Sequence, residues 1–288
     1  MVVESRELAE RVELAWSVRA SHFPMVIGFD YPVDTALISL SGDRCDLNCA
    51  HCGGHYLKHM RPIWDVGEVD APSCLISGGC DARGRVPVTS HLEEVAALRV
   101  GKVMNWHVGF IDREEIEAVA PYVDLISFDL VGDADTAREV YGLDKTLRDY
   151  VDTYRLLKEY VRVVPHLTIG LRGGRISGEY EALRALSGLD MEELVLLVLI
   201  PTQGTRYADR QPPSIEAVTG IMTEARLLFP RTPINLGCMR PHGEYRAKLD
   251  VMAVRCGLNK IVSPAREAVR VAEQLGLEIV HTRECCAI

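Results

Sequence analysis

The chain has 288 residues, of which 48% are hydrophobic, and a formal net charge of -9. This length suits one large core, so we expect a single domain over residues 1–288. The acidic balance argues against a nucleic-acid surface, which needs a basic patch. Because no run of 18 or more apolar residues and no signal-peptide pattern occurs, we also expect a cytoplasmic protein without a membrane partner.

The first 35 residues are predicted to form an extension before the main domain. Leu8, Val12 and Trp16 recur at helical spacing within residues 4–21, with charged residues on the other face. This pattern predicts a helix against the outside or bottom of the domain. Residues 23–32 contain two prolines and a glycine and are predicted to be irregular.

From residue 36 onward, apolar strand patterns alternate with amphipathic helical patterns. Strands are expected at residues 36–41, 74–77, 102–108, 125–131, 161–171, 194–200, 234–237 and 260–262. Helices are expected at residues 91–98, 113–119, 149–160, 180–186, 214–228, 249–256 and 265–275. Apolar strands separated by helices indicate a parallel sheet that is buried on both faces. We therefore predict an α/β fold with a (β/α)8 TIM-type barrel over residues 36–264, with a partial six-strand barrel as the alternative. The last helix and a tail occupy residues 265–288.

A cysteine-rich loop follows the first of these strands. It holds Cys45, Cys49 and Cys52 in the spacing C-x3-C-x2-C. Three thiolates in so short a loop can bind three irons of a 4Fe–4S cluster and leave the fourth iron open to a small molecule. A zinc site is the alternative, although structural zinc usually takes a second Cys or His pair.

Four further cysteines are predicted to gather at one end of the barrel. Cys80 and Cys238 follow strands, at the edge where barrel chemistry takes place. Residues 278–284 are long enough, at roughly 20–25 Å extended, to bring Cys285 and Cys286 to the same rim. These four thiols are candidate ligands of a second, auxiliary 4Fe–4S cluster, and a disordered tail is the alternative. Cys256, by contrast, is expected to be a small core residue.

The cysteine loop and its position after the first strand resemble those of the radical S-adenosylmethionine (SAM) superfamily. The resemblance implies that the open iron binds SAM and that the cluster splits it to a 5′-deoxyadenosyl radical. Gly78 and Gly79 resemble the start of the Gly-Gly-Glu segment that approaches the amino group of SAM, although Cys80 replaces the acid. A simple β-turn is the alternative there.

Three more residues are candidate SAM contacts. Asp129 resembles the acid that binds the SAM ribose in biotin synthase, and a helix N-cap is the alternative. Arg172 is a candidate partner of the methionyl carboxylate, or a solvated or ion-paired residue. His51 takes a position where the superfamily usually has an aromatic residue against adenine.

Several further segments narrow the resemblance to biotin synthase-like proteins. They are LISGGC at 75–80, PHLTIGL at 165–171, IPTQGT at 200–205, GCMRP at 237–241 and the terminal cysteine pair. The chain is similar to one subunit of the two-component lipoyl synthase of many archaea. This similarity implies sulfur insertion into an octanoyl-lysyl carrier protein domain, with a second radical SAM subunit and a low-potential reductant such as ferredoxin as partners. The alternatives are another biotin synthase-like enzyme, for a different sulfur insertion or cofactor maturation, and a non-catalytic iron–sulfur or zinc protein.

Overall fold

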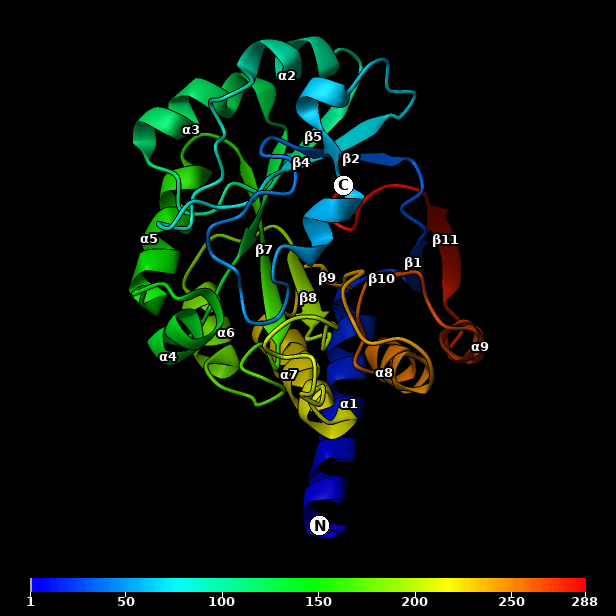
Figure 1. Cartoon of the computed structure of the whole chain (residues 1–288). Coiled ribbons are helices and arrows are strands. Elements are labelled where there is room, and N and C mark those ends of the chain that lie inside the picture. The colour runs from blue at the N-terminus through cyan, green and yellow to red at the C-terminus, as the bar shows by residue number, and fades with distance from the viewer. Residues whose placement is uncertain (1) are drawn as a thin grey trace.

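A long helix opens the chain in the computed structural model, which describes residues 2–288. Helix α1 (Val2–His22) packs against α7 (Ile215–Leu228) and α8 (Glu244–Arg255) and extends beyond the main body (Figure 1). The buried guanidinium of Arg19 donates to the carbonyls of Pro24 and Val26, which fixes the turn that leads out of the helix. The N-terminal helix expected at residues 4–21 is therefore confirmed.

A parallel sheet of eleven strands forms the centre of the fold. Its order is β11-β1-β10-β9-β8-β7-β6-β5-β4-β2-β3. The strands are β1 (Val26–Asp30), β2 (Thr35–Ser39), β3 (Arg61–Pro62), β4 (Ser73–Ser77), β5 (Val103–Trp106), β6 (Leu125–Asp129), β7 (Arg162–Ile169), β8 (Leu194–Val198), β9 (Ile234–Leu236), β10 (Lys260–Val262) and β11 (Glu278–Thr282). All eight expected strands are present. The predicted α/β class is confirmed.

Strand β1 lies in a stretch that the sequence predicts to be irregular, and that prediction is wrong. It pairs with both β10 and β11, and its Ile27 and Phe29 are fully buried. The two prolines of this stretch, Pro24 and Pro32, stand just outside the strand. They therefore bound the strand and remove none of its ladder hydrogen bonds.

The sheet curves as a half-barrel and is not hydrogen-bonded into a ring. A closed eight-strand barrel would pair β2, its first strand, with β10, its last. Here β10 pairs with β1 instead, and no strand pairing joins β1 (which ends at Asp30) to β2 (which begins at Thr35). The tail crosses this gap. Arg283 forms an ion pair with Asp34 (2.7 Å), and the Cys285 N–H donates to the Thr35 hydroxyl (2.9 Å). The Asp34 N–H also donates to the Arg283 carbonyl (2.9 Å), so side-chain and isolated backbone contacts of the tail take the place of a strand ladder there.

Helices cover the convex face of the sheet. Besides α1, α7 and α8 they are α2 (Leu92–Leu98), α3 (Arg113–Val119), α4 (Ala134–Thr136), α5 (Leu147–Lys158), α6 (Glu179–Ser187) and α9 (Arg266–Gln274). Four short turns complete the chain: η1 (His55–His59), η2 (Ile63–Asp65), η3 (Ala120–Tyr122) and the π-helical η4 (Ala137–Tyr141). The main hydrophobic core lies between helices and sheet and includes Cys256, as expected.

The C-terminal segment enters the concave side of the sheet. After β11, which rises parallel to β1 as the tail prediction requires, the chain turns into the interior (Figure 1). Asn105 of β5 donates to the Cys285 sulfur (3.6 Å), and Asn235 of β9 donates to the Cys286 carbonyl (3.2 Å). Because β5 and β9 are not neighbours, a segment that contacts both lies inside the curve. A separate cluster of buried apolar residues forms there: Leu125, Val164, Val195, Val262, Cys286 and Ala287.

Candidate functional site

The cysteine loop begins where β2 ends, at the carboxyl edge of the sheet. The Ser39 hydroxyl donates to the Gly42 carbonyl (2.6 Å), and the Ser41 hydroxyl donates to the Arg44 carbonyl (3.1 Å). These two bonds set the turn that leads into Cys45. A second turn is closed by the Gly53 N–H, which donates to the Cys49 carbonyl (2.9 Å). The loop is thus shaped locally by serines and glycines, at the edge where parallel sheets carry ligands.

The three loop thiols lie close enough to influence one another. A hydrogen bond between Cys49 and Cys52 raises the pKa of Cys49 and lowers the pKa of Cys52 to about 7. Burial raises the pKa of Cys80 to about 12, with contributions from Cys45, its neighbour Asp81, Asp129 and Cys52. Cys80 therefore lies beside the loop. With a pKa of about 7, Cys52 is substantially ionised at neutral pH, and the thiolate is the form that binds iron.

The donor set of this loop fits an iron–sulfur cluster. In the part of the chain that the structure describes, no three His, Cys, Asp or Glu side chains converge at the spacing of ligands around one metal ion. A cubane is far larger than a single ion and takes its thiolates from a wider circle. Cys45, Cys49 and Cys52 would hold it, as the sequence predicts.

Gly79 packs directly against this loop. A Cβ added at Gly79 would come within 1.9 Å of the Arg44 carbonyl oxygen and 2.6 Å of the Cys45 Cβ. The Gly79 N–H donates to the Ser41 hydroxyl (2.6 Å), and the Asp46 N–H donates to the Cys80 carbonyl (2.8 Å). The segment after β4 is therefore the base on which the cysteine loop rests. Contact of Gly78 and Gly79 with SAM stays a prediction.

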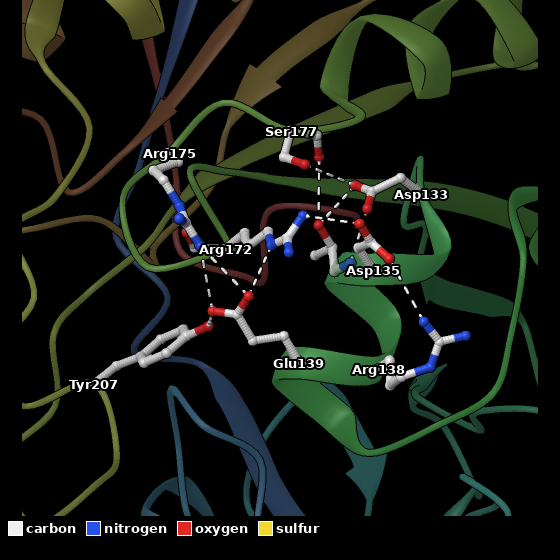
Figure 2. A network of polar contacts seen from close by, with 9 residues as sticks. Asp133, Asp135, Arg138, Glu139, Arg172, Arg175, Ser177 and Tyr207 are labelled. Atoms are coloured by element: carbon white, nitrogen blue, oxygen red, sulfur yellow. Dashed lines mark hydrogen bonds and ion pairs between the residues drawn. The ribbon is translucent and has the colours of Figure 1, made fainter.

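A polar network around Glu139 (Figure 2) is connected to the loop through the backbone of Ala50. The Ala50 N–H donates to the Val140 carbonyl (2.7 Å), and the Ala50 carbonyl accepts from the Tyr207 N–H (3.0 Å). The Tyr207 hydroxyl in turn donates to Glu139 (2.7 Å), which also pairs with Arg172 (2.7 Å). Ala50 lies between Cys49 and His51, so this network holds the loop at its centre.

Arg172 belongs to that network in the structure. It pairs with Glu139 and, at 3.4 Å, with Asp135, while Arg175 reaches Glu139 as well (Figure 2). Arg172 and Tyr207 lower the pKa of Glu139, so the carboxylate stays charged at neutral pH. Of the two interpretations that the sequence left open, the ion-paired one describes this structure. Binding of the methionyl carboxylate by Arg172 remains a prediction.

His51 faces an aromatic residue. Its ring lies edge-on to Tyr141, with 5.7 Å between ring centroids. Burial lowers the pKa of His51 to about 4, so the ring is neutral. Its buried Nδ1 has no hydrogen-bond partner among the described residues. A neutral ring with a free nitrogen is suited to a heteroaromatic ligand such as adenine, which was the predicted role and remains untested.

Asp129 ends β6 on the concave side, together with two histidines. Its carboxylate lies 4.0 Å from Nδ1 of His107, whose ring is 5.6 Å from that of His166. Burial raises the pKa of Asp129 and lowers those of both histidines to about 4. The N-cap of α4 is Asp133, so the N-cap interpretation of Asp129 is excluded. Asp129 is free to accept hydroxyl groups of a ligand.

A second group of thiols consists of the buried Cys286, the half-buried Cys285 and the exposed Cys238. Cys285 and Cys286 are 4.0 Å apart, and His166 Nε2 is 4.0 Å from the Cys286 sulfur. Their hydrogen bond lowers the pKa of Cys285 to about 6. The hydrogen bond to Cys285 and burial raise the pKa of Cys286, with a smaller contribution from Cys238; burial raises the pKa of Cys238, with a contribution from Cys285. The structure thus gathers three of the four predicted auxiliary ligands, while the fourth, Cys80, lies beside the first group. Whether a cluster binds there stays a prediction.

Three residues of this region, His107, Tyr56 and Tyr141, were not predicted as site residues from the sequence. His107 follows β5 at the same carboxyl edge as Asp129, so a search of every strand end would have found it. Tyr56 shares a hydrogen bond of 3.1 Å with Thr202, and burial raises its pKa, with smaller contributions from Cys52 and Cys238. Tyr141 belongs to the π-helical turn and has no sequence signal.

Solved structures share this fold, although the sequence matches no protein family model and no curated protein. The crystal structure of methylornithine synthase (PylB) has a TM-score of 0.66 at 16% identity, over 95% of this chain and 89% of that one. The FeFe-hydrogenase maturase HydG from Carboxydothermus hydrogenoformans has a TM-score of 0.65 at 15% identity, over 93% of this chain and 71% of that one. At these identities the likeness establishes the fold.

The half-barrel of this chain is therefore the fold of these two solved enzymes, and the likeness extends over nearly the whole chain. The cysteine loop stands at the carboxyl edge of that half-barrel, and the second group of thiols lies inside it. Within residues 2–288 no helix is long and apolar enough to cross a membrane.

Proposed function

We propose that this chain is a radical SAM enzyme that inserts sulfur into an unactivated C–H bond of a protein-bound octanoyl chain, as one component of a two-subunit lipoyl synthase. The observation that carries the proposal is the pair of thiol groups. One stands on the loop after β2, and the other lies inside the half-barrel beneath it.

The proposal assigns a role to each group of site residues. Cys45, Cys49 and Cys52 would hold a 4Fe–4S cluster, and Cys238 with Cys285 or Cys286 would hold an auxiliary one. When bound, the first cluster with SAM supplies a 5′-deoxyadenosyl radical that removes a hydrogen atom, and the second supplies sulfide for the new C–S bond. Asp129 would orient the ribose, and His51 the adenine. The buried apolar residues around Cys286 would help to exclude water from the proposed reaction site.

The partners follow from this chemistry. An octanoyl-lysyl arm is long and apolar at its tip, so it can reach the interior while its carrier domain stays outside. The second C–S bond would be made by a second radical SAM subunit, and a low-potential reductant such as ferredoxin would supply the electrons.

The test incubates the anaerobically reconstituted, reduced protein with SAM and an octanoyl-lysyl peptide, with and without the partner subunit. A mass gain of one sulfur atom and release of 5′-deoxyadenosine are expected. Metal analysis should give about eight irons per chain, and Cys238→Ala about four. Cys256→Ala, a buried cysteine of the main core, is the matched control and should keep the full iron content. Zinc without SAM cleavage would refute the proposal.

A second candidate is another biotin synthase-like enzyme with a different sulfur insertion or a cofactor maturation. The position of Cys80 favours it, because the fourth predicted auxiliary ligand lies beside the first group of thiols. SAM cleavage and product formation on another substrate that survive Cys238→Ala would identify this alternative.

A further inference from the structure

A cavity of about 540 Å³ opens on the outer side of the cysteine loop. It is lined by residues 41–44 together with Leu57, Lys58, Met60, Pro62 and Trp64. We call this space the outer cavity. One wall therefore ends at Arg44, the residue before Cys45, and the other begins five residues after Cys52. None of Asp129, His166 and Cys238, which face the interior, contributes to it, so an occupant would leave the interior open.

The outer cavity carries an exposed tryptophan at its edge. Trp64 is 52% exposed, and its ring lies over Gly42, where an added Cβ would be 3.1 Å from the ring. The ring also lies 5.8 Å from that of His91. Because the Trp64 ring packs against the backbone of Gly42, its orientation is restricted while much of the ring stays exposed. A restricted, exposed tryptophan is typical of a residue that anchors a protein–protein contact.

The charge of this region is opposite to that of the whole chain. Residues 55–65 contain Lys58, Arg61 and two histidines and a single acidic residue, Asp65, in a chain of net charge -9. Arg44 adds a further cation, and Asp43 is the acidic residue in the lining. In the described part of the chain, no carboxylate forms an ion pair with Arg44, Lys58 or Arg61. These cations are therefore available to a partner of opposite charge.

We infer that the outer cavity is the docking site of a small acidic one-electron donor protein. The inference rests on the proposed function, because that chemistry requires an electron to reach the cluster. In the proposed step the donor loses one electron and the cluster gains it, with no bond made or broken between the two proteins. Electron transfer slows steeply with distance, and the Trp64 ring lies over Gly42, which is three residues before Cys45 in the cysteine loop. Such complexes are small and weak, which suits one pocket with one aromatic anchor.

The probe is an acidic 4Fe–4S ferredoxin, immobilised for anaerobic binding measurements with the reconstituted protein. Lys58→Glu/Arg61→Glu should weaken binding about tenfold at low salt, and added salt should weaken the wild-type complex more than the variant complex. Trp64→Ala should weaken binding at all salt concentrations. Arg266→Glu/Arg270→Glu is the matched control, because it makes the same charge change on exposed positions of α9 and should bind as the wild type does.

Cluster reduction provides the second measurement. Bleaching of the cluster by reduced ferredoxin should slow about tenfold in Lys58→Glu/Arg61→Glu, whereas bleaching by dithionite, a small chemical reductant, should be unchanged. Ferredoxin binding and reduction equal to wild type in all variants would overturn the inference. Loss of binding to an octanoylated carrier domain with unchanged ferredoxin binding would overturn it too and assign the surface to the carrier. Failure of SAM cleavage with dithionite in the wild type would instead refute the proposed function, and the two failures are thereby distinguished.

Discussion

A buried ion pair should stabilise the turn that carries Cys238, one of the second group of thiols. Arg240 and Asp250 are both fully buried and bind through two parallel hydrogen bonds of 2.7 and 2.9 Å. The same guanidinium donates to the carbonyls of Gly237 and Val262, both at 2.7 Å. Asp250 also accepts the N–H of Ala265 (2.9 Å). The pair therefore ties the turn that carries Cys238 to the end of β10 and the start of α9.

Asp250→Ala should destabilise the protein by about 3–5 kcal/mol, because it leaves a buried guanidinium with no counter-charge. For a chain of this size, that corresponds to a fall of about 5–8 °C in Tm, measured by circular dichroism at a fixed scan rate. Lys248→Ala, on the same helix, removes an exposed pair with Glu244 and should leave Tm unchanged. The double variant Arg240→Met/Asp250→Leu should recover part of the loss, since no unpaired charge remains.

An Asp250→Ala variant with the same Tm as the wild type would refute this role of the ion pair. A loss in the double variant as large as in the single one would show that packing, not charge, is responsible. Iron content provides a second measurement: if Arg240 positions the Cys238 turn, Asp250→Ala should lose part of the auxiliary iron at temperatures where the protein remains folded.

Three further outcomes are expected. Gly79→Ala should impair folding and cluster incorporation, because its Cβ would overlap the Arg44 carbonyl, whereas Gly67→Ala, with no atom within 4 Å, should be neutral in both Tm and iron content. Glu139→Gln should lower Tm at neutral pH. Because the folded-state pKa of Glu139 is lowered, its contribution is fully present above its ordinary pKa, and the difference from wild type should shrink as pH falls below about 4; a constant difference would contradict this. Cys52→Ser should remove about four irons and abolish 5′-deoxyadenosine formation on anaerobic reconstitution, while full iron content would show that this thiol is not a ligand.

Local patterns were sufficient to predict most of the fold. The alternation of apolar runs and amphipathic helices gave eight strands and seven helices, because periodicity and capping act within a few residues. The short spacing of Cys45, Cys49 and Cys52 likewise identified the loop, since three thiols in eight residues cannot lie far apart. Proline-bounded β1 was missed, because its strand character comes from its two neighbours in the sheet.

Only the tertiary structure decided which distant groups meet. The length of the C-terminal segment was enough to predict that Cys285 and Cys286 can reach the half-barrel. Their place in its interior depends on hydrogen bonds from Asn105 and Asn235, which lie on strands over a hundred residues apart. The sequence could not place Cys80 beside the first thiols, nor pair Arg172 with Glu139. The physical reason is that such contacts depend on the curvature of the whole sheet, which no local stretch of sequence specifies.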